Sequence, residues 1–222
     1  MVLVADLAHP ALADDAVHHL TRVLRLRPGD PIVVADGRGS WAPAVLTDGG
    51  AAEVAGPVAS APAPAPAVTV AFALVKGDKP ELVVQKLTEL GVDRIVPFRA
   101  DRSVVRWDAA KAARATARLR AVAASATAQC HRPWRPEVAE VTDLASLVAG
   151  GAALADRAGG PVSLAHPTVA VGPEGGWSEA EAALAAPRVR LTDHVLRAET
   201  AAVTAGALLV ALRAGSVGPA AH

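Results

Sequence analysis

Apolar residues in the back two thirds of the chain form short runs that alternate with segments of helical spacing. The runs at 68–75, 92–98 and 169–171 are each followed by polar residues. Segment 80–90 has apolar positions at helical spacing and is followed by Gly91, which is typical of a helix C-cap. Strands that alternate with helices predict a parallel sheet with helices on both faces. The other elements expected are strands at 152–154 and 189–191 and helices at 109–128, 178–186 and 198–213.

The front of the chain has a different pattern. A helical stripe of Val17, Leu20, Val23 and Leu24 follows Asp14-Asp15, either of which is a candidate N-cap. Strand-like stretches come next, separated by turns that contain glycine. This pattern predicts a small, mostly β barrel or meander. Its expected strands lie at 31–35, 41–46 and 51–55.

An alternating Ala-Pro segment at residues 61–67 separates these two parts. Proline-rich sequences adopt extended and stiff conformations, so the segment is interpreted as a connector. We therefore expect two domains, residues 1–66 and residues 67–222. The predicted fold class is α/β, preceded by a small β domain.

Composition and charge limit the classes of function. The 22 basic residues balance the 22 acidic ones, which argues against a protein that coats nucleic acid by bulk charge and leaves a local basic face open. The single cysteine, Cys130, excludes an internal disulfide and a cysteine-rich metal site and favours a reducing compartment. His18 and His19 lack a third ligand at metal spacing, so we expect no metal.

Neither a signal peptide nor a membrane span is expected. The N-terminus lacks a charged start followed by a long apolar stretch. The longest apolar run near the C-terminus, residues 205–212, is far too short to cross a bilayer. We therefore expect a cytoplasmic protein with no membrane partner.

Two loops carry the candidate chemistry. An apolar run ends at the loop Gly172-Pro-Glu-Gly-Gly176, after which Ser178 is the candidate N-cap of a helix. Glycines allow backbone N–H and C=O groups to approach a ligand closely. A second polar cluster, Arg197, Glu199 and Thr200, opens the last helix. Loops at the strand ends of one α/β sheet predict a small-molecule site.

Other nucleotide-binding and hydrolytic motifs are absent, and basic residues cluster at segment ends instead. The loop at 172–176 does not have the spacing GxGxxG, and the loop at 75–79 lacks the glycine spacing and the ending of a P-loop. Ser178 does not lie in a G-x-S-x-G turn. The basic residues that could hold phosphate groups are His18, His19, Arg22, Arg25 and Arg27 in the front part and Arg102, Arg106, Arg132 and Arg135 in the back part. Lys76 and Lys79 follow a strand at the predicted carboxyl edge of the sheet, where open α/β sheets place ligands.

Together these residues resemble the RsmE family, the ribosomal RNA small-subunit uridine-N3 methyltransferases of the SPOUT class. The matches run in order through nearly the whole chain, and the full set is far more specific than any single motif. They are His19-Leu-Thr-Arg-Val-Leu-Arg25 with Gly29-Asp30, Leu74-Val-Lys-Gly-Asp-Lys79, Val84-Gln-Lys-Leu-Thr-Glu-Leu-Gly-Val92, Pro97-Phe98 with Arg102-Ser103, Gln129-Cys130 with Arg132, Val171-Gly-Pro-Glu-Gly-Gly176, and Val195-Leu-Arg-Ala-Glu-Thr200.

The resemblance implies an N-terminal PUA-like β barrel that binds RNA and a C-terminal α/β domain with a trefoil knot. It implies S-adenosylmethionine as the cofactor and 16S rRNA of the 30S subunit as the substrate. It also implies a homodimer in which the partner subunit completes each site. The residues carried over as cofactor-binding are Val171, Gly172, Pro173, Glu174, Gly175, Gly176, Leu191, Val195, Leu196, Arg197 and Thr200.

The implied reaction transfers a methyl group in line from a sulfonium to uracil N3, which is a poor nucleophile until it loses its imide proton. Arg197, or an arginine of the partner subunit such as Arg102, would stabilise negative charge on O2 or O4. Glu199 or Glu174 would orient these groups or relay the proton. The expected catalytic residues are therefore Arg197, Glu199 and Arg102. The residues expected to bind RNA are His19, Arg22, Arg25, Lys76, Arg102 and Arg132.

The chain departs from the family pattern in two places. Ala128 stands where the family often has Glu. Thr192 replaces a glycine of the second loop, which leaves that loop's backbone shape open, and His194 replaces an arginine, which weakens one RNA or cofactor contact. Two alternatives stay open: another SPOUT enzyme, acting on a ribose 2′-OH or another base, and a non-catalytic RNA-binding assembly factor. Zero net charge suggests that the substrate is a preassembled particle rather than free RNA.

Overall fold

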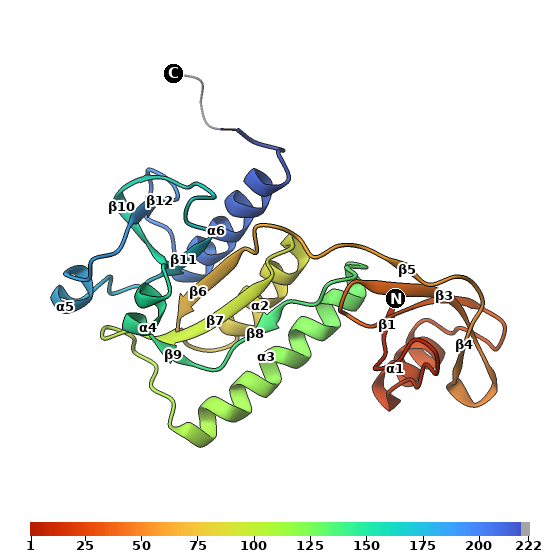
Figure 1. The fold of residues 1–222 in the computed structure, drawn as a ribbon. Helices are drawn as coiled ribbons and strands as arrows, with labels where there is room; N and C mark the ends of the chain where they lie inside the picture. The colour runs from red at the N-terminus through yellow and green to blue at the C-terminus, as the bar shows by residue number, and fades with distance from the viewer. Residues whose placement is uncertain (219–222) are drawn as a thin grey trace. The chain divides into compact units, whose positions relative to one another are not determined.

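The computed structural model describes residues 1–218, which form two compact units (Figure 1). The first unit comprises Met1–Ala63 together with Ala124–Arg135. The second comprises Pro64–Ala123 and the described residues from Pro136 onward. Each unit has its own hydrophobic core.

The first unit is built on a five-stranded, mainly antiparallel sheet. Its strands run in the order β1-β2-β3-β4, and β5 also pairs with β3. Only β1 and β2 are parallel among these pairs. Alternate residues such as Val34, Ala42 and Ala44 form the core of the sheet. The strands are β1 (Val2–Leu3), β2 (Pro31–Ala35), β3 (Ser40–Leu46), β4 (Ala52–Val54) and β5 (Ala59–Ser60), and a 3-10 turn, η2, covers Asp48–Gly50.

The helical segment of this unit differs from the continuous amphipathic helix that its sequence predicts. Helix α1 (Asp14–His18) passes directly into a π-helical turn, η1 (His19–Val23). The N-cap position is Ala13, so the predicted capping by Asp14 or Asp15 is wrong; both lie in the first turn. The extra residue of a π-helical turn shifts the helical phase. Leu20 is consequently buried, whereas Val23 and Leu24 are 60% and 52% exposed.

The second unit contains a parallel sheet, as predicted. Its strands run in the order β12-β10-β11-β6-β7-β8, β9 also pairs with β7, and every pairing among the described residues is parallel. Neighbours in the sheet are therefore far apart in the chain, and β11 pairs with β6 along Thr168–Val171. The strands are β6 (Thr69–Ala73), β7 (Arg94–Arg99), β8 (Glu137–Val138), β9 (Thr142–Asp143), β10 (Ala153–Pro161), β11 (Thr168–Val171) and β12 (Arg188–Arg190).

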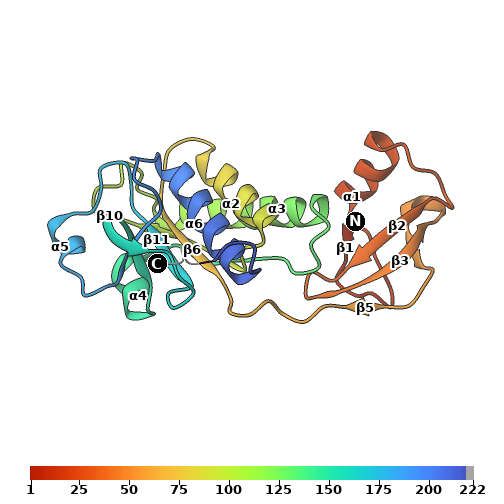
Figure 2. The same cartoon turned by 90° about the horizontal axis from the view of Figure 1, so that it is seen from above.

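Helices cover both faces of this sheet (Figure 2). Alternation along β6 sends Val70 and Phe72 into a core shared with α2 and α6, and Ala71 and Ala73 into a core shared with α4. Residues of α3 join the first of these cores. The helices are α2 (Lys79–Leu90), α3 (Ala109–Gln129), α4 (Leu144–Ala149), α5 (Glu179–Ala182) and α6 (Ala198–Arg213).

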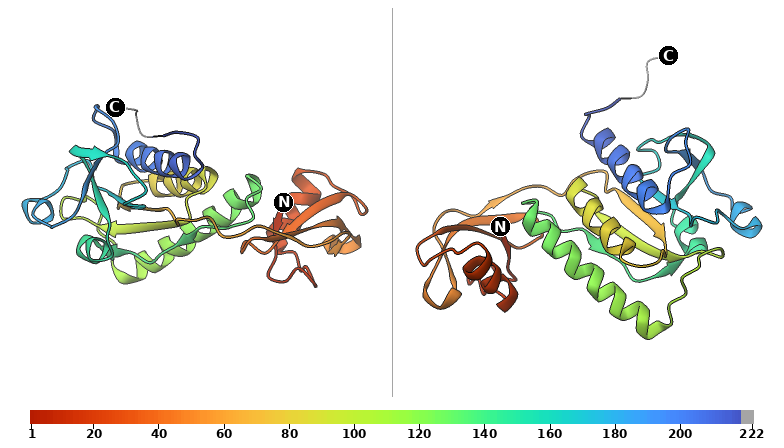
Figure 3. Two further views of the ribbon diagram at one scale, coloured as in Figure 1. Left: turned by 45° about the horizontal axis from the view of Figure 1, so that its top comes forward. Right: turned by 180° about the vertical axis from the view of Figure 1, so that it is seen from behind.

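Helices α2 and α6 lie side by side over β6 (Figure 3). Gly206 of α6 makes this approach possible, because a Cβ at that position would lie only 2.5 Å from Leu87 Cδ2 and 3.0 Å from Val92 Cγ2. The predicted C-cap of α2 is confirmed: Gly91 adopts φ +99° and donates its N–H to the carbonyl of Thr88. One glycine thus ends α2, and another inside α6 lets the two helices pack closely.

The structure corrects two predicted boundaries in this unit and adds three short elements. Helix α5 ends at Ala182 rather than residue 186, and Pro187 follows shortly after. Strand β10 continues to Pro161, well beyond the predicted residue 154, with an irregularity in its pairing between Ala155 and Gly160. The short elements β8, β9 and α4 lie between the predicted ones and were not expected from the sequence.

Candidate active site

Two loops meet at the carboxyl edge of the parallel sheet. The first loop, residues 172–177, leaves β11, and the second loop, residues 191–197, connects β12 to α6. A cavity of about 320 Å³ lies between them, which is within the range of small-molecule sites. Open α/β sheets place ligands at this edge, outside the carboxyl ends of the strands.

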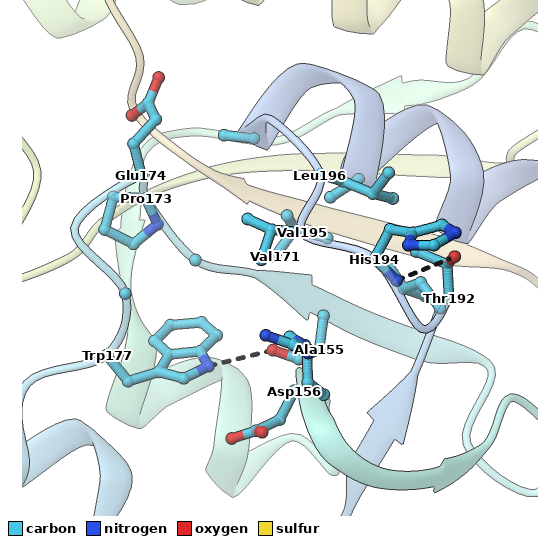
Figure 4. Close-up of a pocket in the computed structure, with 16 residues that line it drawn as sticks. Ala155, Asp156, Val171, Pro173, Glu174, Trp177, Thr192, His194, Val195 and Leu196 are labelled. Atoms are coloured by element: carbon cyan, nitrogen blue, oxygen red, sulfur yellow. Dashed lines mark hydrogen bonds between the residues drawn. The ribbon is translucent and has the colours of Figure 1, made fainter.

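Strand β10, the two loops and the start of α6 form the walls of this cavity (Figure 4). Val171, Leu191 and Leu196 supply apolar surface, whereas Asp156 and Glu174 supply carboxylates. The lining residues are Ala155, Asp156, Arg157, Val171, Gly172, Pro173, Glu174, Gly176, Trp177, Leu191, Thr192, His194, Val195, Leu196, Ala198 and Ala201.

The glycines of the first loop are required by its geometry. Gly176 adopts φ +69°, a left-handed conformation that other residues rarely take, and donates its N–H to the carbonyl of Pro173 at 2.9 Å. A Cβ on Gly172 would lie 3.2 Å from the indole of Trp177. The loop therefore folds tightly back on itself and exposes its backbone to the cavity.

Trp177 fixes the loop against the sheet. Its indole N–H donates to the carbonyl of Ala155 on β10 at 3.1 Å (Figure 4). Its ring stacks on Phe98 of β7, with centroids 6.2 Å apart and planes inclined by 16°. One side chain thus connects the first loop to two separate strands and forms one wall of the cavity.

The loop after β7 is also held against the first loop. Ser178 and Glu181 form a capping box at the start of α5. The Ser178 hydroxyl donates to Asp101 Oδ2 at 2.6 Å, and the N–H of Asp101 donates to the buried Glu181 carboxylate at 2.9 Å. Arg102 Nη1 then donates to the carbonyl of Gly175 at 3.2 Å. Arg102 is thereby placed beside the first loop of its own chain.

Lys79 connects three segments at the edge of the site. Its ammonium lies 3.2 Å from Glu199 Oε2 at the start of α6 and 3.4 Å from Glu174 Oε1 in the first loop. The side chains of Lys79 and Glu199 are 34% and 14% exposed, so this ion pair is partly shielded from water. Lys79 thus links α2, the first loop and the start of α6.

The ionisation of this cluster is biased toward the charged forms. Burial alone would raise the pKa of the Glu199 carboxyl, but a backbone hydrogen bond at the helix start and the cations of Lys79 and Arg197 lower that pKa below its ordinary value. The hydrogen bond to Glu199 raises the pKa of Lys79, against a smaller effect of desolvation, and Glu174 adds to the increase. Glu199 is therefore a stable anion and a weak proton acceptor at neutral pH.

The structure brings most of the predicted cofactor residues to one cavity. Gly175, Arg197 and Thr200 lie outside its lining, and the other eight predicted residues lie within it. Arg197 is exposed at the N-cap of α6, and its carbonyl accepts the N–H of the partly buried Ala201 one turn later. Of the predicted catalytic residues, Arg197 and Glu199 are neighbours, as the influence of Arg197 on the pKa of Glu199 indicates.

The predicted RNA-binding residues are divided between the two units. His19, Arg22 and Arg25 are exposed on and after η1 of the first unit, and Arg25 has a positive φ of 57°. Arg132 is half-buried and belongs to the same unit. Lys76 and Arg102 are exposed in loops of the second unit. The predicted face of Arg102, Arg106, Arg132 and Arg135 is therefore divided as well.

Several residues of the site have weak sequence signals. Asp156 lines the cavity and pairs with Arg188 on β12 at 2.7 Å, but neither residue lies in a predicted loop. Trp177 directly follows the glycine loop, and its proximity to that motif is the only sequence signal for its role.

In residues 1–218 no group of three His, Cys, Asp or Glu side chains is arranged to hold a metal ion. In the same range, no helix combines the length and apolarity of a membrane span.

The sequence matches the models of two protein families. The RNA methyltransferase domain family matches residues 62–210, and the RNA methyltransferase PUA domain family matches residues 12–54. Among curated relatives, Ribosomal RNA small subunit methyltransferase E of Mycobacterium tuberculosis is 34% identical, with 86% of this chain and 82% of the relative covered. The protein of the same name from Synechocystis is 33% identical, with 88% of this chain and 71% of the relative covered.

Solved structures agree with these sequence relationships. Ribosomal RNA small subunit methyltransferase E from Neisseria gonorrhoeae, bound to S-adenosyl methionine, superposes with a TM-score of 0.78 at 31% identity and 90% coverage of each chain. A methyltransferase from Legionella pneumophila in complex with SAM has a TM-score of 0.83 at 26% identity, with 95% and 96% of the two chains covered. The α/β fold, its parallel sheet and the PUA domain are thus shown together. The chain belongs to the ribosomal RNA small subunit methyltransferase E family of RNA methyltransferases.

Proposed function

We propose that this protein transfers a methyl group from S-adenosylmethionine to N3 of one uridine of 16S rRNA in the small ribosomal subunit. One observation carries the proposal. The two loops that the family resemblance assigns to the cofactor form one cavity at the carboxyl edge of the sheet, in a chain that aligns over 90% of its length with a SAM-bound relative.

The residues around the cavity fit S-adenosylmethionine. Val171, Leu191 and Leu196 offer an apolar wall for the adenine ring, and the glycine-containing first loop offers backbone donors and acceptors. Glu174 places a carboxylate in the lining, which suits a cofactor that carries a sulfonium cation. The bound cofactor supplies the electrophilic methyl group. Thr192 and His194, where the family usually has glycine and arginine, also lie in this lining.

The chain's own charges act on the uracil. Uracil N3 is nucleophilic only after loss of its imide proton, and the resulting negative charge spreads onto O2 and O4. The exposed guanidinium of Arg197 stabilises that charge, and Arg102, fixed beside Gly175, is a second cation for the same task. Glu199 pairs with Lys79 near Arg197, and its lowered pKa makes it a poor acceptor for that proton.

The proposal extends to architecture and assembly. The domains are residues 1–66, a PUA-like β barrel that holds RNA through His19, Arg22 and Arg25, and residues 67–222, a SPOUT domain. Arg132 lies outside residues 1–66 but belongs to the same compact unit as the barrel, and it adds to the barrel's RNA contact. Strand β10 separates β11 from β12 in the sheet, so the first loop and α5 must cross β10, which supports a knotted C-terminal path. The enzyme is a homodimer, and the partner subunit completes each site. Lys76 and Arg102 extend the RNA contact on the SPOUT domain.

The test is methyl transfer from labelled S-adenosylmethionine to 30S subunits that lack the modification, with wild-type enzyme and Arg197→Ala. We expect methylation by the wild type and a kcat about 100-fold lower for the variant, since removal of one group that stabilises transition-state charge costs two to three orders of magnitude. Cofactor affinity should stay unchanged, because Arg197 lies outside the cavity lining. Cofactor binding without methylation of any RNA would reject the proposal in favour of an RNA-binding assembly factor.

A further inference from the structure

A second cavity, of about 220 Å³, lies in the same unit and shares no residue with the first. It lies between the start of α2 and the first half of α3. Cations and one aromatic ring dominate its walls. The lining residues are Gly77, Pro80, Glu81, Trp107, Lys111, Arg114, Ala115, Arg118 and Leu119.

The cations of this cavity form one stripe on α3. Lys111, Arg114 and Arg118 are separated by three and four residues, so they project from the same helix face. Asp108 begins this helix by accepting the N–H of Lys111 at 2.7 Å, which fixes the first turn. Trp107 immediately precedes this cap and is half-buried. The aromatic ring is therefore held next to the positive stripe.

Only part of the positive charge is neutralised by the protein. Arg118 Nε lies 2.9 Å from Glu81 Oε1, which ties α3 to α2. Lys111 and Arg114 are exposed and form no ion pair with any residue in the range 1–218. Glu81 Oε2 is buried and receives no hydrogen bond within that range. A chain of zero net charge thus carries local positive charge beside an aromatic ring and an unused carboxylate acceptor.

We propose that this cavity binds one unpaired nucleotide of the RNA substrate, away from the nucleotide that is methylated. The base packs on the indole of Trp107, since every base has a π face that an aromatic side chain can stack on. Lys111 and Arg114 hold the adjoining phosphate. That the RNA is 16S rRNA rests on the proposed function. That a nucleotide binds here is inferred from the residues of the cavity alone.

The turn at the start of α2 connects the second cavity to the candidate active site. Gly77 and Pro80 form part of its wall, and Lys79 lies between them in the sequence. Lys79 in turn bonds Glu199 and Glu174 of the candidate active site. One short turn therefore contributes to both sites. A nucleotide bound in the second cavity positions the RNA and contacts the same turn that organises the catalytic charges.

The first test separates RNA binding from cofactor binding. We expect Trp107→Ala to raise KM for 30S subunits about tenfold, in the range reported for the loss of one stacked base, and to leave kcat and SAM affinity unchanged. Trp107→Phe keeps a stacking ring and should restore KM to within about threefold. The exposed double variant Lys111→Ala/Arg114→Ala should raise KM and reduce the slope of log KM against log salt by about 1.

Arg94→Ala is the matched control. Arg94 is an exposed cation of the same unit, paired with Glu137 at 3.2 Å and absent from both cavities. We expect its KM to equal that of the wild type. An unchanged KM in Trp107→Ala and in the double variant would overturn the proposal, as would an equal increase in Arg94→Ala.

The second test does not require turnover. Wild-type protein is crosslinked with ultraviolet light to 30S subunits lacking the modification, digested with trypsin and nuclease, and examined by mass spectrometry. Trypsin cleaves after Arg106 and Lys111, and we expect the peptide 107–111 to carry one nucleotide. A crosslink there without any methyl transfer would reject the proposed reaction and retain the nucleotide site. Methyl transfer without this crosslink, and with unchanged KM in the variants, would reject the site alone.

Discussion

Lys79 is the single residue on which most of the charge arrangement depends. It reaches Glu174 over 95 residues of sequence and Glu199 over 120. The sequence predicts it only as one of two lysines that follow a strand, because nothing local indicates which carboxylates the fold will bring to it. In the structure a backbone hydrogen bond and the ammonium of Lys79 together lower the pKa of Glu199 beside Arg197.

We predict that Lys79→Met lowers kcat by about tenfold or more while Lys79→Arg retains most activity, since a lost charge-assisted contact disturbs the orientation of Glu199 and the first loop. Steady-state methyl transfer to 30S subunits measures the effect. Lys86→Met is the control on the same helix, because Glu89 is the single ion-pair partner of Lys86 among residues 1–218. Activity lost equally in Lys86→Met would show that Lys79 has no special role.

The contribution of this cluster to stability should depend on pH in a defined direction. The pKa of Glu199 is lowered on folding, so its stabilising contribution is complete above its ordinary unfolded pKa and is lost as pH falls through the folded value. The pKa of Lys79 is raised, so its contribution is complete below its ordinary value and is lost as pH rises through the folded value. Both contributions are therefore present at neutral pH.

We predict that the difference in Tm between wild type and Glu199→Gln is constant from about pH 6 to pH 8 and shrinks in acid, as pH falls below the ordinary glutamate pKa of about 4.3 and through the lower folded value. Thermal unfolding monitored by circular dichroism measures it. A difference that changed steadily through neutral pH would contradict a lowered pKa of Glu199.

At the scale of elements, long amphipathic segments were predictable and short ones were not. Helices α2, α3 and α6 have enough turns to show their periodicity, and their predicted ends lie within a few residues of the observed ones. Two-residue strands such as β8 and β9 have no periodic signal, since they form only because β7 offers them an edge. The π-helical turn η1 likewise has no pattern distinct from an α-helix.

The residues of the candidate site also fall into those that the sequence predicted and those that it did not. The glycine loop and the start of α6 were predictable, because glycines and capping residues have strong local meaning. The wall made by Asp156 and Trp177 was not, because it depends on β10 lying between β11 and β12. The action of Arg102 from a partner subunit stays a prediction; in the structure Arg102 contacts Gly175 of its own chain, a contact that the sequence does not indicate. Tertiary placement, rather than residue type, decides these positions.

Replacement of Ser178 tests whether helix α5 holds the first loop in place. We predict that Ser178→Ala destabilises the protein by about 1 kcal/mol, the usual cost of losing an N-cap, because both the capping box and the hydrogen bond to Asp101 are lost. Urea unfolding followed by circular dichroism gives this free energy. SAM affinity should fall as well. Glu179→Gln, an exposed change in the same turn, should stay within about 0.5 kcal/mol of the wild type.

At the scale of the whole molecule, balanced charge predicts what kind of RNA the enzyme accepts. The 22 basic and 22 acidic residues leave no bulk attraction for free RNA, so affinity must come from placed groups such as Arg22, Arg25 and Lys111. A preassembled particle presents its phosphate groups to these side chains in a fixed arrangement. We predict that 30S subunits are methylated at least about tenfold faster than naked 16S rRNA at equal concentration and at physiological salt. Equal rates would reject recognition of the particle.

The most direct test of the central claim is the identity of the methylated nucleoside. 30S subunits that lack the modification are incubated with the wild-type protein and labelled S-adenosylmethionine, and their 16S rRNA is digested to nucleosides for mass spectrometry. A cofactor cavity flanked by Arg197 predicts a single labelled product, 3-methyluridine. A labelled 2′-O-methyl nucleoside, or a methyl group on another base, would contradict transfer to uridine N3.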